Sequence, residues 1–239
     1  MRGKVEEEDY RGLLRIYPGQ TEIQQSLRRL QKESHLYLSD DELDELDTYA
    51  KRIRGEVLFA RAWILCEGQS EYVLIKCFAD LLARPLDRAG VTVIDFQNNG
   101  SPGAFVGLAR AFDIPWIMIC DNDQEGENFV EQIHKRGLST QEIESLVLKL
   151  PGAGVRLEEF LVRNGLAPEL RRVLASKGVR LIKQQGEEGC EEEMVEHLRR
   201  DKTGYALALV NELRESGADE SRVPELFRSL ISQITQRTI

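Results

Sequence analysis

Short apolar runs alternate with amphipathic stretches through the middle of the chain. The runs are short enough for buried strands, and the stretches between them place apolar residues at helical spacing. The expected strands are 62–66, 91–95, 115–120 and 146–150. The expected helices between them are 71–83, 103–112 and 127–137. Because strands that alternate with helices form a parallel sheet with helices on its faces, the pattern predicts an α/β domain.

The pattern is helical on both sides of this region. Ser39 and Glu42 form a capping box, and apolar residues then recur at helical spacing as far as Leu58, which predicts a helix leading into the first strand. Four further helices are expected near the end of the chain, at 168–178, 190–200, 204–217 and 224–237. The chain therefore divides into three expected parts: a helical lead-in at 1–60, an α/β domain at 61–165 and a helical region at 166–239.

Composition limits where the protein acts. The chain has 239 residues, of which 41% are hydrophobic, enough for one sizeable core and a smaller attached unit. No apolar run approaches the ~20 residues that cross a bilayer, and the first residues lack the apolar core of a signal peptide. We expect a soluble, cytoplasmic protein without membrane contact.

Cysteine spacing and net charge bear on which metal sites, disulfides and nucleic-acid-binding surfaces the protein can have. The four cysteines show no paired spacing and the three histidines are dispersed, so buried thiols are expected rather than a zinc site or a disulfide framework. The net charge of -9 argues against a uniformly basic surface for nucleic acid. It leaves open a local basic groove or an acidic site that cations neutralise.

Acidic residues follow two of the expected strands. Glu67 comes directly after the first strand, and Glu71 lies one turn into the next helix on the same side. Asp121 and Asp123 follow the third strand, and alternate residues of an extended chain point the same way. Because functional groups of parallel sheets gather at the carboxyl ends of the strands, we expect these four carboxylates in one crevice.

Four like charges in one crevice require neutralisation by protons or cations. Hard divalent cations such as Mg²⁺ or Mn²⁺ accept oxygen ligands alone. Two such ions about 3.5–4 Å apart can activate water and stabilise the leaving oxygen of a phosphodiester. Taken singly, Glu71, Glu125 and Glu127 are equally compatible with solvated helix faces. The combination of Glu67, Asp121 and Asp123 after two strands favours a site.

The two acidic segments also resemble a known signature. The run C-E-G-Q-S-E at 66–71 and the run D-N-D-Q-E-G at 121–126 resemble the Toprim motif of topoisomerases, bacterial primases, recombination mediators and a group of nucleases. Within that superfamily, residues 55–71 resemble the entry to the Toprim domain of the overcoming lysogenization defect (OLD) nucleases. The resemblance covers roughly 61–165 and implies a Rossmann-like Toprim fold with a parallel central sheet, followed by an additional helical domain.

The OLD resemblance implies two more site residues. Glu158, at Leu-Glu-x-x-Leu spacing, matches an acidic residue that these nucleases add to the metal site, with Glu159 as the alternative one residue out of register. Lys202 resembles a lysine placed near the metals, where its ammonium would neutralise charge developing on the phosphate. The other interpretation of Lys202 is a surface lysine beside Asp201.

The same resemblance implies a partner domain. OLD proteins carry this region after an ABC-type ATPase domain, and this sequence has no G-x-x-x-x-G-K-[ST] phosphate loop. We expect the C-terminal nuclease part of such a protein, with its own or a separate ATPase domain. OLD proteins commonly dimerise through the ATPase part, so this fragment is expected to be monomeric. The D-x-D-x-E-G-E run at 121–127 also resembles type IA topoisomerases, but no nucleophilic tyrosine or strand-passage domain can be recognised.

Two weaker features concern phosphate binding. The glycine-rich loop at 97–105 either presents backbone N–H groups to a phosphate or is a plain connecting turn. Five basic residues at helical spacing form either a phosphate track or solvated helix faces. They are Arg171, Arg172, Lys177, Arg180 and Lys183.

The combined expectation is a metal-dependent DNA endonuclease that nicks and cleaves phosphodiester bonds by a two-metal mechanism. Its two Mg²⁺ or Mn²⁺ ions would be held by Glu67, Glu71, Asp121, Asp123 and Glu158. Glu67 and Lys202 are the expected catalytic residues. The alternatives are a Toprim nuclease that processes structured RNA and a non-catalytic interaction module that binds a cation.

Overall fold

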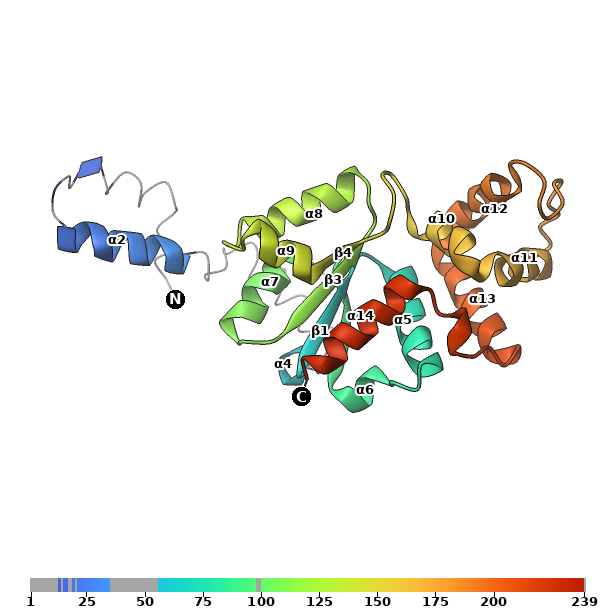
Figure 1. Cartoon of the computed structure of the whole chain (residues 1–239), viewed down its shortest axis with the longest axis horizontal. Helices are drawn as coiled ribbons and strands as arrows, with labels where there is room; N and C mark the ends of the chain where they lie inside the picture. The colour runs from blue at the N-terminus through green and yellow to red at the C-terminus, as the bar shows by residue number, and fades with distance from the viewer. Residues whose placement is uncertain are drawn as a thin grey trace.

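The computed structural model describes residues 13, 15–16, 19, 21–34, 56–97 and 100–238. Most of the helix expected between Ser39 and Leu58 lies outside these residues. In the described N-terminal part, α2 (Thr21–Ser34) is a separate helix, and α4 (Glu56–Phe59) leads directly into the sheet (Figure 1).

A parallel sheet forms the centre of the molecule (Figure 1). Its strand order is β2-β1-β3-β4, and all three neighbouring pairs are parallel. The strands are β1 (Ala62–Cys66), β2 (Val91–Asp95), β3 (Trp116–Cys120) and β4 (Val147–Lys149). β1 and β3 are buried along their whole length, as central strands covered on both faces should be. The α/β prediction is confirmed, with each expected strand in place.

Helices cover both faces of the sheet. One face packs against α7 (Pro102–Ala111), α8 (Gln124–His134) and α9 (Thr140–Leu146), which contribute Phe105, Phe129 and Ile143 to the same core cluster. The other face packs against α5 (Gln69–Leu81), with α6 (Leu86–Ala89) beside it. The short helix α9 was not predicted from the sequence, although Ser139 and Glu142 form a capping box at its start.

The remaining helices follow β4. They are α10 (Leu157–Leu161), the π-helical turn η1 (Val162–Leu166), α11 (Ala167–Ser176), α12 (Cys190–Leu198), η2 (Arg199–Asp201), α13 (Lys202–Glu215), η3 (Glu220–Arg222) and α14 (Glu225–Gln236). Four of these, α11 to α14, match the helices expected from the sequence. No helix in the described ranges is both long and apolar enough to cross a bilayer.

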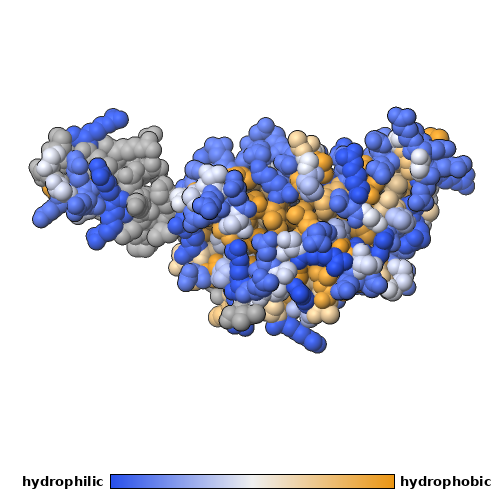
Figure 2. Space-filling view, in the orientation of Figure 1, coloured by the Kyte–Doolittle hydropathy of each residue, from blue (hydrophilic) through white to orange (hydrophobic). Residues whose placement is uncertain are grey.

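The last helix returns to the sheet. α14 contacts α5, β1 and β3, so it completes the layer that covers this face (Figure 1). The ring of Phe227 on α14 lies 4.9 Å from that of Phe78 on α5 and 6.0 Å from that of Phe160 on α10. One core cluster therefore continues across the domain boundary expected at residue 166. In Figure 2 hydrophobic residues gather over the sheet, whereas the end formed by α11 and α12 is mainly hydrophilic.

Candidate active site

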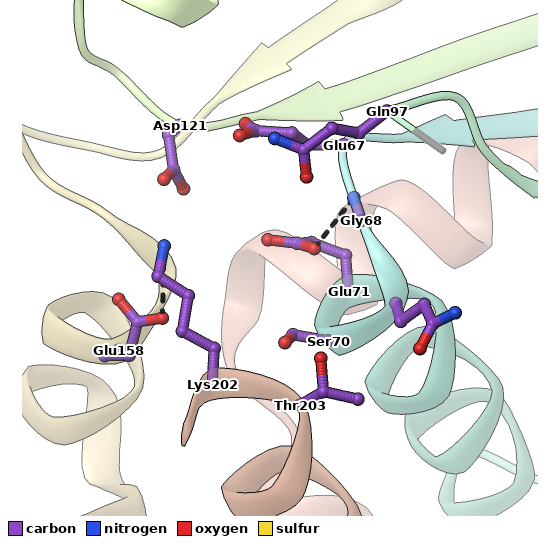
Figure 3. A pocket seen from close by; sticks show the side chains of 10 residues that line it. Glu67, Gly68, Ser70, Glu71, Gln97, Asp121, Glu158, Lys202 and Thr203 are labelled. Carbon is purple, nitrogen blue, oxygen red and sulfur yellow. Dashed lines mark hydrogen bonds and ion pairs between the residues drawn. The ribbon is translucent and has the colours of Figure 1, made fainter. Parts of the chain in front are cut away.

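A cavity of about 330 Å³ lies at the carboxyl ends of β1, β2 and β3 (Figure 3). Its wall comes from the segments after these three strands and from α10 and α13. The lining residues are Glu67, Gly68, Gln69, Ser70, Glu71, Gln97, Asp121, Glu158, Lys202 and Thr203. Four carboxylates and one ammonium group thus share one cavity.

The β1–α5 junction supplies the first two carboxylates. Glu67 follows β1, and one of its carboxylate oxygens, Oε2, is buried without a hydrogen-bond partner. Glu71 lies in the first turn of α5, where the N–H of Gly68 donates to its Oε2 at 3.1 Å. Glu71 therefore caps the helix with one oxygen and lines the cavity as the sequence predicted.

The contact between the end of β3 and the start of α10 supplies the other two carboxylates, those of Asp121 and Glu158. Asp121 is 6% exposed, and its Oδ1 accepts a hydrogen bond from the N–H of Leu157 at 3.1 Å. This bond fixes the start of α10 against the end of β3, so the next residue, Glu158, faces the cavity. Glu158 is 5% exposed, and its Oε2 is buried without a hydrogen-bond partner.

The neighbouring glutamate points elsewhere. Glu159 pairs with Arg163 at 2.6 Å and with Arg199 at 3.8 Å, and it does not line the cavity. The structure therefore places Glu158, the preferred residue of the two, among the other carboxylates.

Lys202 is the only basic residue among those that line the cavity. It is the first residue of α13, and its Nζ lies 3.6 Å from Glu158 Oε1 (Figure 3). Asp201 instead accepts from the N–H of Gly204 at 3.0 Å and pairs with Lys177 at 3.3 Å. The geometry favours a site lysine over a surface lysine held by Asp201.

Burial and mutual repulsion raise the pKa values of three carboxylates in this cavity. Burial, with the nearby Asp121 charge, raises the pKa of Glu67 to about 7. Burial also raises the pKa of Glu71 to about 8, against hydrogen bonds that lower it. Burial and the charge of Glu158 raise the pKa of Asp121 to about 6. The cavity therefore favours bound protons or cations at neutral pH.

Asp123 lies beside the cavity and does not line it. Its Oδ1 accepts from the N–H groups of Glu125 at 3.0 Å and Gly126 at 3.1 Å, and its Oδ2 pairs with Arg156 Nε at 3.1 Å. Burial raises its pKa, but these hydrogen bonds and the Arg156 charge outweigh burial and lower it overall. Of the four carboxylates expected in one crevice, the structure places Glu67, Glu71 and Asp121 in the lining of the cavity, whereas Asp123 serves as the N-cap of α8. Its role as a metal ligand stays a prediction.

Within the described ranges, no group of three or more His, Cys, Asp or Glu side chains is arranged to hold a metal ion. The side chains nevertheless suit a hard cation by their chemistry. All the acidic donors are oxygens, and the partnerless oxygens of Glu67 and Glu158 are buried, which is costly without a cation or a hydrogen-bond donor. The residues fit a divalent cation through their donor set rather than through a preformed geometry.

Five lining residues were not predicted as site residues from the sequence: Gly68, Gln69, Ser70, Gln97 and Thr203. Gln97 belongs to the glycine-rich loop, and its backbone N–H donates to the carbonyl of Glu67 at 2.9 Å. The helix after this loop is capped by Ser101, which accepts from the N–H of Ala104 at 3.3 Å. The part of the loop at 98–99 lies outside the described residues.

The expected phosphate track is largely occupied by contacts within the protein. Arg172 pairs with Glu212 at 2.5 Å, and Lys177 pairs with Asp201 at 3.3 Å. Arg171 donates to Cys190 Sγ at 2.6 Å. These contacts favour the interpretation of solvated, ion-paired helix faces.

The domain model for the overcoming lysogenization defect protein-like TOPRIM domain matches residues 58–123. Residues 58–123 thus match an OLD-like Toprim domain. The matched segment includes Glu67, Glu71 and Asp121 of the cavity and ends before Glu158 and Lys202. The Toprim fold expected from the two acidic runs is thus confirmed.

The chain also matches part of a longer protein. The chain is 27% identical over 136 residues to the uncharacterized protein YbjD of Escherichia coli (strain K12), a match covering 57% of this chain and 24% of YbjD. It thus spans about a quarter of that protein.

Two solved structures share the fold over a longer part of the chain. The C-terminal region of the Burkholderia pseudomallei OLD protein has a TM-score of 0.59 and 20% identity, and covers 76% of this chain and 100% of its own. The C-terminal region of the Xanthomonas campestris pv. campestris OLD protein has a TM-score of 0.58 and 21% identity, and covers 77% and 96%.

Proposed function

We propose that this chain is a metal-dependent nuclease that cleaves phosphodiester bonds in DNA, as the nuclease part of an OLD-type ATPase–nuclease. The observation that carries this proposal is the cavity itself. Separate segments of the chain bring Glu67, Glu71, Asp121, Glu158 and Lys202 together at the carboxyl ends of the strands of an OLD-like Toprim domain. Such a set suits phosphoryl chemistry, in which positioning and charge stabilisation dominate.

Each residue has a separate part in this proposal. Glu67, Glu71, Asp121 and Glu158, with Asp123 after a rearrangement, would hold two Mg²⁺ or Mn²⁺ ions. When bound, these ions would supply an activated water and stabilise the leaving oxygen. Asp121 also positions Glu158 through Leu157, and the hydrogen bond from Gly68 fixes the orientation of Glu71. The ammonium of Lys202 would stabilise negative charge on the phosphate as it reacts.

The ATPase partner, the cytoplasmic location and the monomeric state belong to the same proposal. YbjD extends well beyond the matched segment, which leaves room there for a further domain. We expect an ABC-type ATPase domain either in the same protein or as a separate chain. The fragment is expected to elute as a monomer in size-exclusion chromatography with light scattering.

The decisive experiment uses supercoiled plasmid with EDTA, Mg²⁺, Mn²⁺ or Ca²⁺ in parallel. The wild-type protein should convert the plasmid to nicked and linear forms with Mg²⁺ or Mn²⁺ only. Glu67→Gln and Asp121→Asn should lose this activity, and Glu159→Gln should retain it because Glu159 faces away from the cavity. Cleavage by Glu67→Gln at the wild-type rate, or no cleavage with any metal, would contradict the proposal. A structured RNA assayed alongside separates a DNA nuclease from an RNA-processing one.

A further inference from the structure

Arg156 lies close to both aspartates that follow β3, Asp121 and Asp123. It is the N-cap residue of α10, directly before Leu157, whose N–H is held by Asp121. Its side chain is 47% exposed, and its Nε lies 3.1 Å from Asp123 Oδ2. The backbone of Arg156 is thus fixed beside the cavity, while its guanidinium group forms an ion pair with Asp123.

Arg156 occupies the oxygen that Asp123 could offer to a cation. Asp123 Oδ1 already accepts two N–H groups at the start of α8, from Glu125 and Gly126. Moving Oδ1 would uncap that helix, which costs about 1 kcal/mol. Oδ2 has Arg156 as its partner in an ion pair whose arginine side chain is 47% exposed and whose aspartate side chain is 15% exposed. Ion pairs that water reaches on one side contribute little stability. Oδ2 is therefore the oxygen that can be released at least cost.

A cation at Asp123 Oδ2 and the guanidinium of Arg156 would compete for one oxygen, because the two positive charges repel at that distance. We propose that Arg156 exchanges Asp123 for a backbone phosphate of the nucleic acid when Asp123 Oδ2 binds a divalent cation, while Oδ1 continues to cap α8. This inference rests on the proposed nuclease function. It assigns Arg156 as a substrate-binding residue and explains why Asp123 lies outside the cavity here.

Two features of the site favour a phosphate as the second partner. The lining of the cavity carries four carboxylates and a single lysine, so a polyanion needs further positive charge at the rim. The terminal nitrogens of Arg156 make no hydrogen bond within the described part of the chain, and a guanidinium group matches two phosphate oxygens at once. Arg156 can therefore meet a phosphate without breaking any contact besides that with Asp123.

The test is Arg156→Gln, which should shift two affinities in opposite directions. Without DNA, Mn²⁺ should bind about twofold to fivefold more tightly by titration calorimetry, since the competitor for Asp123 is gone. With Ca²⁺ in place of Mg²⁺, a labelled DNA duplex should bind about twofold to fivefold more weakly, with a salt dependence reduced by about one phosphate contact. In cleavage assays KM should rise while kcat stays close to the wild-type value.

Arg163→Gln is the matched control. Arg163 is 48% exposed and pairs with Glu159 at 2.6 Å, away from the cavity. Both affinities should stay unchanged in Arg163→Gln, and Arg156→Lys should recover part of the DNA affinity.

Three outcomes would overturn the exchange. If Arg156→Gln weakens metal and DNA binding together, Arg156 has only a structural role. If Arg156→Gln changes neither affinity while the wild-type protein cleaves DNA, the exchange is wrong and the nuclease stands. If the wild-type protein neither cleaves nor binds DNA, the proposed function fails and the exchange fails with it.

Discussion

At the residue scale, Lys202 occupies a position that helix electrostatics disfavour. A lysine at the first position of a helix opposes the positive end of the helix dipole, here that of α13. Its Nζ lies 3.6 Å from Glu158, in a cavity with three further carboxylates. The negative charge of the cavity offsets the unfavourable dipole, so the position is understandable only together with the site.

We predict that Lys202→Met lowers the cleavage rate by about 10²–10³-fold, because a charge aimed at the reacting phosphate is removed. Mn²⁺ affinity should not fall, since the substitution removes a cation from a carboxylate cluster. Single-turnover cleavage and calorimetry measure the two quantities. Lys76→Met is the control, because Lys76 pairs with Asp87 instead. A loss of cleavage with an equal loss of metal affinity would contradict the assigned role.

Glu71 leads to a prediction about stability and pH. Its pKa is raised from 4.5 to about 8 in the folded protein, mainly by burial. Between these values the folded protein binds more protons than the unfolded chain, so the free energy of unfolding falls as pH rises from about 4.5 to about 8. Urea unfolding in EDTA should show this decline in the wild-type protein. It should be smaller in Glu71→Gln, and equal slopes in both proteins would contradict the assignment.

At the scale of elements, the β3–α8 junction depends on one glycine. A Cβ on Gly126 would lie 2.1 Å from the carbonyl oxygen of Asp121, a backbone atom that cannot easily move. The glycine of the D-N-D-Q-E-G run therefore lets α8 start directly beside Asp121. Glycine is needed at position 126 for steric reasons and not for its backbone freedom, because the backbone of Gly126 has ordinary helical geometry.

We predict that Gly126→Ala lowers the free energy of unfolding by about 1–3 kcal/mol through this overlap. The sign is diagnostic, because alanine in an open helix position would stabilise by up to about 1 kcal/mol. Urea unfolding measures the change. Gly68→Ala is the comparison, since its Cβ would meet only side-chain oxygens, at 3.3 and 3.6 Å, and should cost less. A stabilised Gly126→Ala would disprove the close approach.

The sequence predicted the elements of the sheet and the carboxylates at their ends for one physical reason. Buried strands need continuous apolar runs, and parallel strands gather their following residues at one edge. Asp123 does not line the cavity, because one oxygen of its carboxylate caps α8 and the other pairs with Arg156, and spacing alone predicts neither contact. Gln97 and Thr203 reach the cavity through tertiary packing, for which the sequence carries no local signal.

At the scale of the whole molecule, α14 joins the sheet to the helical region. The apolar face of this helix was predictable from its periodicity, but periodicity does not identify the surface that the face covers. Phe227 is fully buried and contacts Phe78 of α5 and Phe160 of α10. The final helix thus packs against both the helix after Glu67 and the helix that carries Glu158.

We predict that Phe227→Ala destabilises the protein by about 3–5 kcal/mol, because a large side chain is removed from a fully packed site. Phe112→Ala should change stability by less than about 0.5 kcal/mol, since Phe112 is 60% exposed. Thermal and urea unfolding check both variants. Similar stability losses for the two would disprove the joining role of α14.

The end of α14 has a practical consequence for handling the protein. Arg237 donates from Nη1 to the carbonyl of Trp116, the first residue of β3, at 3.5 Å, so the end of α14 lies at the start of that strand. The cavity opens at the opposite ends of the strands, and five strand residues span about 16 Å. A fluorophore or an immobilising tag attached after α14 would therefore leave the mouth of the cavity accessible to a long polymer. Single-molecule measurements on a surface-tethered protein become feasible through that end.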